Sequence, residues 1–100
     1  EDSVNYIVLE QIEKLGEAYA KMQPADQVKF LKKAYRLGAK NNDISKNVAK
    51  AKIGTLDSDL ESGRFSDLSE SYFNEVSEFF RDSIRKELKS GENIMPFINA

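Results

Sequence analysis

The chain of 100 residues contains no cysteine, no histidine and no tryptophan. Without cysteine it forms no disulfide bond and offers no thiolate ligand for zinc. Histidine is the commonest general base and the commonest ligand of transition metals. Its absence therefore excludes most familiar catalytic arrangements. We therefore expect a protein that is not an enzyme and that uses no metal ion or other cofactor.

Residues that interrupt helices are also few, with two prolines and five glycines. No apolar run approaches the roughly 18 residues needed to cross a bilayer, and the first residues lack a basic segment followed by an apolar one. The alternation of apolar and polar residues that is typical of strands is absent as well. The composition, 40% hydrophobic and 32% charged, is that of an ordinary soluble folded chain, which we expect to form one domain over residues 1–100.

Apolar residues recur every three or four positions, which predicts helices. Pro24 suits the first turn of a helix and Gly63 suits a helix end, so both mark boundaries. The expected helices cover about residues 3–22, 24–40, 43–62 and 66–89. Because the intervening turns are short, the sequence predicts an all-α fold, a compact antiparallel bundle of four main helices.

The third expected helix carries its apolar residues on two different faces. Ile44 and Val48 define one face, whereas Ile53 and Leu56 define another, and a straight helix cannot turn both toward one core. We therefore expect a kink or break near Gly54, where the chain is most easily bent.

The chain ends with four large apolar residues after Gly91, namely Ile94, Met95, Phe97 and Ile98. Pro96 opposes a regular helix there, so we expect an apolar, non-helical C-terminal tail that covers an edge of the bundle or reaches a partner. Three apolar residues lie off the main stripe of the first helix: Tyr6, Ile7 and Leu9. These two groups are our candidate partner-binding residues, for a different protein or for a second copy of this chain.

Charge is strongly partitioned along the chain, although the net charge is only −2. Residues 1–28 carry six acidic and two basic residues, and residues 53–79 carry seven acidic and one basic residue. Between them, residues 29–52 carry one acidic and eight basic residues, which are Lys29, Lys32, Lys33, Arg36, Lys40, Lys46, Lys50 and Lys52.

The basic segment has two interpretations. Its cations form a binding surface for an anion, such as an acidic protein, nucleic acid or a membrane surface, or they pair with acidic residues of the same molecule. The low isoelectric point, about 5.2, argues against nucleic acid, and the apolar half of the second helix is needed for the core rather than for a membrane.

Two further sequence patterns bear on possible binding sites. Phe73, Phe80 and Ile84 lie along one edge of a wide apolar band in the last helix, where they would line a pocket for an apolar ligand or contribute to the core. The acidic residues of segment 57–63 resemble the start of a calcium loop, but the glycine is misplaced and the final glutamate is missing. The sequence thus favours a non-enzymatic interaction module of an adaptor or regulatory type, with anion binding and apolar-ligand binding as alternatives.

Overall fold

The computed structural model describes residues 2–90, apart from the side chains at 2, 4, 89 and 90, and folds them into four helices. These are α1 (Asp2–Ala20), α2 (Pro24–Lys40), α3 (Lys46–Ser62) and α4 (Phe65–Ser90). The described residues contain no strand, which confirms the predicted all-α bundle. The expected tail, with Ile94, Met95, Phe97 and Ile98, lies outside the described residues.

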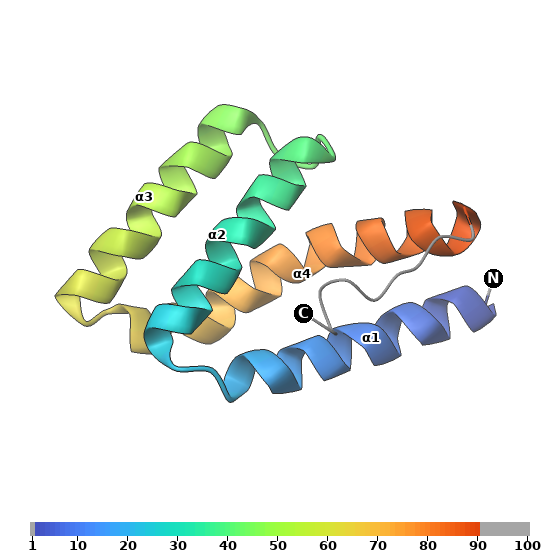
Figure 1. Cartoon of the computed structure of the whole chain (residues 1–100), viewed down its shortest axis with the longest axis horizontal. Coiled ribbons are helices and arrows are strands. Elements are labelled where there is room, and N and C mark those ends of the chain that lie inside the picture. The colour runs from blue at the N-terminus through green and yellow to red at the C-terminus, as the bar shows by residue number, and fades with distance from the viewer. Residues whose placement is uncertain (1, 91–100) are drawn as a thin grey trace.

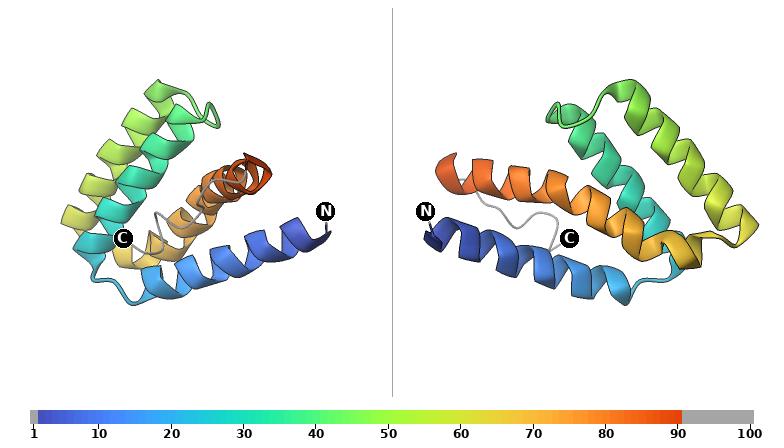
Figure 2. Two further views of the ribbon diagram at one scale, coloured as in Figure 1. Left: turned by 45° about the vertical axis from the view of Figure 1, so that its right-hand side comes forward. Right: turned by 180° about the vertical axis from the view of Figure 1, so that it is seen from behind.

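The bundle consists of two antiparallel helix pairs that cross at an angle (Figure 1). One pair is α1 with α4, and the other is α2 with α3 (Figure 2). α4 contacts all three other helices and is the central element, whereas α3 contacts α2 and α4. As a result, α1 and α3 lie on opposite sides of the molecule.

The wide apolar band of α4 covers two neighbouring helices. Phe73 faces α1, with its ring centroid 4.8 Å from that of Tyr19. Phe79 faces α2, with its ring centroid 6.1 Å from that of Tyr35. All four side chains are buried, so the fold itself accounts for the width of the band.

α3 is one continuous helix and its ribbon runs straight along its length (Figure 1), so the kink or break predicted near Gly54 was wrong. The prediction assumed that both apolar faces meet the core. In the structure Ile44 precedes the helix and Val48 is 45% exposed, so only the face that carries Leu56 is buried. The helix also begins at Lys46 rather than at residue 43, because the Ser45 side chain caps it by accepting a hydrogen bond from the amide of Val48 (3.1 Å).

Gly38 brings the end of α2 close to α4. A Cβ atom at this position would lie 2.9 Å from Cδ2 of Phe79, well inside the usual carbon contact of about 3.5–4.0 Å. The Gly38 carbonyl also accepts hydrogen bonds from the amides of Asp43 (2.8 Å) and Ile44 (3.4 Å). Together with the left-handed backbone of Asn42 (φ 64°), these bonds close the turn that places α3 beside α2.

Candidate functional site: a basic groove between α2 and α3

A groove of about 790 Å³ runs between α2 and α3 on the outside of the molecule. Both helices contribute cations to its sides, small or apolar side chains form its floor, and the connecting turn closes one end. The lining residues are Arg36, Ala39, Lys40, Asn42, Lys46, Ala49, Lys50 and Ile53.

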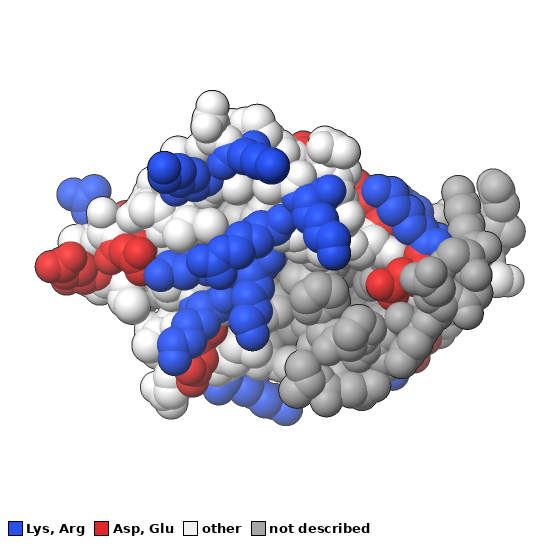
Figure 3. Space-filling view, turned by 45° about the horizontal axis from the view of Figure 1, so that its top comes forward, with Lys and Arg blue, Asp and Glu red and all other residues white. Residues whose placement is uncertain are grey.

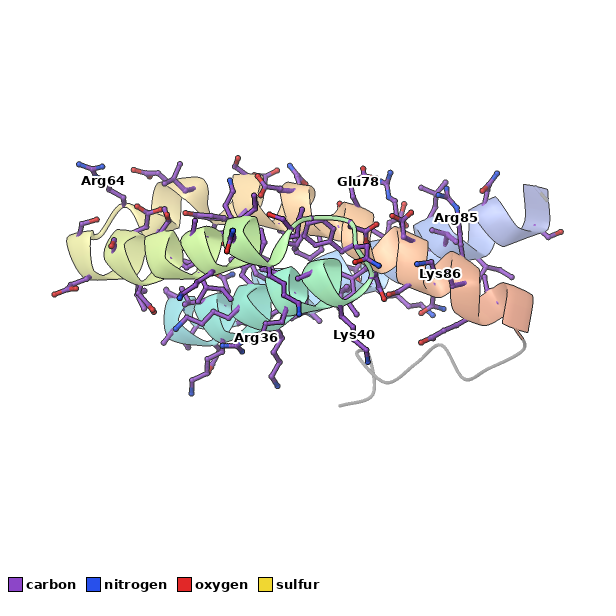
Figure 4. The ribbon with its side chains drawn as sticks, turned by 90° about the horizontal axis from the view of Figure 1, so that it is seen from above. Arg36, Lys40, Arg64, Glu78, Arg85 and Lys86 are labelled. Carbon is purple, nitrogen blue, oxygen red and sulfur yellow. The ribbon has the colours of Figure 1, made fainter. Side chains whose placement is uncertain are left out.

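The cations of the groove follow from the way α2 is buried. Leu31, Ala34 and Tyr35 are fully buried against the rest of the bundle, so Arg36 and Lys40 project to the outside (Figure 4). These two residues are one helical turn apart, about 6 Å along the axis. Lys46 and Lys50 repeat the same spacing on the antiparallel α3. The groove is therefore flanked by two rows of positive charge at matched intervals.

The floor of the groove is apolar because small residues let the two helices approach. Ala49 is buried, whereas Ala39 and Ile53 are partly buried and pack against the core from the groove side. Sequence reasoning did not identify these floor residues, although two alanines at the junction of two amphipathic helices are a usable signal for close helix contact. A ligand for this groove needs apolar groups as well as negative charge.

Pairing within the molecule applies to two cations of the predicted basic set. Lys32 Nζ lies 2.7 Å from Oδ1 of Asp57, and Lys52 Nζ lies 3.3 Å from Oε1 of Glu75. Glu75 also accepts a hydrogen bond from the hydroxyl of buried Tyr35 (2.9 Å). Burial, and secondarily this carboxylate, raises the pKa of Tyr35, so the hydroxyl stays protonated.

The groove cations differ from this pattern. Within residues 2–90, no ion pair joins Arg36, Lys40, Lys46 or Lys50 to a carboxylate. Figure 3 shows that Lys and Arg side chains gather over α2 and α3, with acidic side chains toward the margins. The remaining members of the predicted set, Lys29 and Lys33, are exposed on α2 and extend the positive surface beyond the groove.

The predicted partner-binding residues of the first helix lie apart from the groove. Tyr6 is 69% exposed and Leu9 is 53% exposed, whereas Ile7 is half-buried. All three belong to α1, on the opposite side of the molecule from α3. The structure thus places two separate candidate surfaces on the described part of the chain.

The residues proposed for an apolar ligand are packed into the core. Phe80 and Ile84 are buried, and the rings of Phe80 and Phe73 lie 5.5 Å and 6.2 Å from that of Phe30. A hollow of about 430 Å³ beside Phe73 is lined partly by Tyr19, which is engaged in hydrogen bonds.

The polar groups of this hollow bind one another. The Tyr19 hydroxyl lies 2.7 Å from Oγ of Ser69, which donates to Oε1 of Gln27 (2.9 Å). Gln27 returns a hydrogen bond from Nε2 to the carbonyl of Tyr19 (2.9 Å). This closed set of hydrogen bonds fixes α1, α2 and α4 relative to one another and leaves these groups little capacity for a ligand.

Other kinds of site have no support within residues 2–90. No group of three acidic side chains there is arranged to hold a metal ion. Segment 57–63 is the end of α3, and Gly63 terminates the helix in the left-handed conformation (φ 81°). None of the described helices is both long and apolar enough to span a membrane.

The chain matches no protein-family model, no curated protein and no solved structure. The assignment of function depends on the groove and on the surfaces around it.

Proposed function

We propose that the protein is a non-enzymatic interaction module whose α2–α3 groove binds an acidic, partly apolar segment of a partner protein. One observation carries the proposal: the groove combines four cations that have no ion pair within residues 2–90 with an apolar floor. An acidic amphipathic helix offers both complementary features at helical spacing.

The comparison with the paired lysines supports this role. Lys32 forms an ion pair with Asp57, and Lys52 forms one with Glu75. Carboxylates that can pair with cations of α2 and α3 are therefore present in this part of the molecule. The groove cations nevertheless cluster without such neighbours, and like charges that flank one groove repel one another. Binding of an anionic partner relieves this repulsion, and the positive charge of the groove raises the rate at which such a partner associates.

The apolar floor favours a protein segment over the other anions that the basic surface could attract. Ala39, Ala49 and Ile53 offer no hydrogen bond to a phosphate, but they receive aliphatic or aromatic side chains. The acidic side chains toward the margins of the basic surface in Figure 3 also repel a long polyanion. Nucleic acid and a membrane surface are therefore the alternative occupants that the experiment must separate.

The test compares two variants with the same change in charge. Arg36→Gln/Lys50→Gln removes one arginine and one lysine from the groove, and Lys21→Gln/Arg64→Gln removes the same types from exposed positions outside it. The probe is an amphipathic acidic peptide of about 15 residues, long enough for four helical turns, titrated by isothermal calorimetry.

We expect the groove variant to bind the peptide about tenfold more weakly and the control variant to bind as the wild type does. Replacing the apolar residues of the peptide with serine should also weaken binding. Equal losses in both variants would contradict the proposal. Tighter binding of a single-stranded oligonucleotide or of anionic vesicles than of the peptide would assign the groove to one of those anions instead.

A further inference from the structure

The outer face of α1 has the composition that the groove requires. Apart from the buried stripe, an arc of roughly 100° carries Tyr6, Leu9, Glu10, Glu13 and Glu17. All five are exposed, and Tyr6 and Leu9 are two of the large apolar side chains most open to solvent in residues 2–90. This face therefore presents apolar anchors followed by carboxylates along one helix.

The spacing of charge on the outer face of α1 matches that of the groove. Glu13 and Glu17 are four residues apart, about 6 Å along the axis, as are Arg36 and Lys40 on α2. Glu10 forms a long, exposed ion pair with Lys14 (3.6 Å), which contributes little. Within residues 2–90, Glu13 and Glu17 form no ion pair.

A molecule cannot place this face in its own groove. α1 is held on α4 through its buried stripe, which includes Val8 and Tyr19, and its outer face points away from that contact. The groove lies on the opposite helix pair (Figure 1). The two surfaces are complementary in charge and in apolar content, but they meet only between two copies.

We propose that the outer face of α1 binds in the α2–α3 groove of a second copy of this chain, in a head-to-tail arrangement. The proposal rests on the proposed function of the groove and names one partner for it. Tyr6 and Leu9 contact the apolar floor, and Glu13 and Glu17 pair with groove cations. Since each copy that makes one such contact retains one free face and one free groove, the contact builds either open chains or closed rings.

The contact uses a single helix face, so we expect a low affinity, and its charge pairs make it weaker as salt is added. Sedimentation equilibrium of the full chain at up to about 1 mM protein should give an average mass above that of the monomer at low salt. The mass should fall toward the monomer value as the ionic strength rises from about 0.02 M to 0.5 M.

Charge exchange identifies the contact. Glu13→Lys/Glu17→Lys and, separately, Arg36→Glu/Lys50→Glu should each weaken self-association at least about tenfold. Combining all four changes in one chain, or mixing the two double variants, should restore it. The substituted side chains are exposed, and circular dichroism verifies that each variant retains its helices.

Two results would overturn the inference: a monomer at the highest concentration in low salt, or self-association that the Glu13→Lys/Glu17→Lys change leaves intact. Failure of the charge exchange to restore association would also count against it. If self-association is absent but the acidic peptide still binds the groove, only this inference fails. If neither is observed, the proposed function fails as well.

Discussion

Substitution of alanine for two glycines tests the description of α2 and α3 together. Both Gly38 and Gly54 are helical, so alanine at either position reduces the entropy lost on folding. At Gly54 a Cβ atom meets nothing within 4 Å, so Gly54→Ala should stabilise the protein by about 0.5–1 kcal/mol.

At Gly38 the added methyl group collides with Phe79. The Cβ atom would lie 2.9 Å from Cδ2 and 3.0 Å from Cγ of the ring, which is buried and cannot move without shifting its neighbours. Overpacking of this kind costs about 1–3 kcal/mol, and the gain in helix propensity is smaller in the last turn of α2. We therefore expect Gly38→Ala to destabilise the protein by about 1 kcal/mol or more.

The difference between the two variants isolates the steric cost, because the substitution is the same. Urea unfolding followed by far-ultraviolet circular dichroism measures both free energies. In thermal unfolding, each 1 kcal/mol corresponds to about 4–8 °C for a domain of this size. A destabilised Gly54→Ala variant would mean that α3 is broken there after all. A Gly38→Ala variant as stable as Gly54→Ala would refute the close contact of α2 with α4.

Three further substitutions test other parts of the fold. Gly63→Ala should destabilise the protein by about 1 kcal/mol, measured by urea unfolding, because alanine disfavours the left-handed backbone found there (φ 81°). Gln27→Ala should cost about 1–2 kcal/mol in the same assay, because it leaves the buried carbonyl of Tyr19 without its side-chain donor. Tyr35→Phe should cost a similar amount near neutral pH through the lost bond to Glu75. The pKa of Tyr35 is raised on folding, so its contribution is complete below about pH 10, where tyrosine ionises in the unfolded chain, and is lost as the pH rises further. The thermal midpoint of Tyr35→Phe should accordingly fall less steeply above that pH than that of the wild type.

Much of the fold could be predicted because its signals are local. Helical periodicity and the punctuation at Pro24 and Gly63 identify four helices with boundaries close to the observed ones. The error at Gly54 arose from treating every apolar residue as buried. Val48 contradicts that assumption, since it is 45% exposed. The helix therefore does not have to turn this side chain toward the core.

The candidate site could be predicted only in part. The sequence identifies each basic residue. Whether a given cation forms an ion pair within the molecule depends on neighbours that are remote in sequence. Asp57 and Glu75 neutralise Lys32 and Lys52 across helix contacts that no local pattern reveals. The apolar floor, which includes Ala49, likewise exists only because α2 and α3 pack antiparallel.

The central claim is that the α2–α3 groove binds an acidic protein segment, and mapping of amide chemical shifts tests it most directly. Titration of the isotope-labelled chain with the acidic amphipathic peptide should shift the amide signals of residues that line the groove, Ala39, Asn42, Ala49 and Ile53 foremost. The signals of buried α4 residues such as Val76 should change little. Shifts concentrated on α1 and α4, or none at the groove at saturating peptide, would contradict the account.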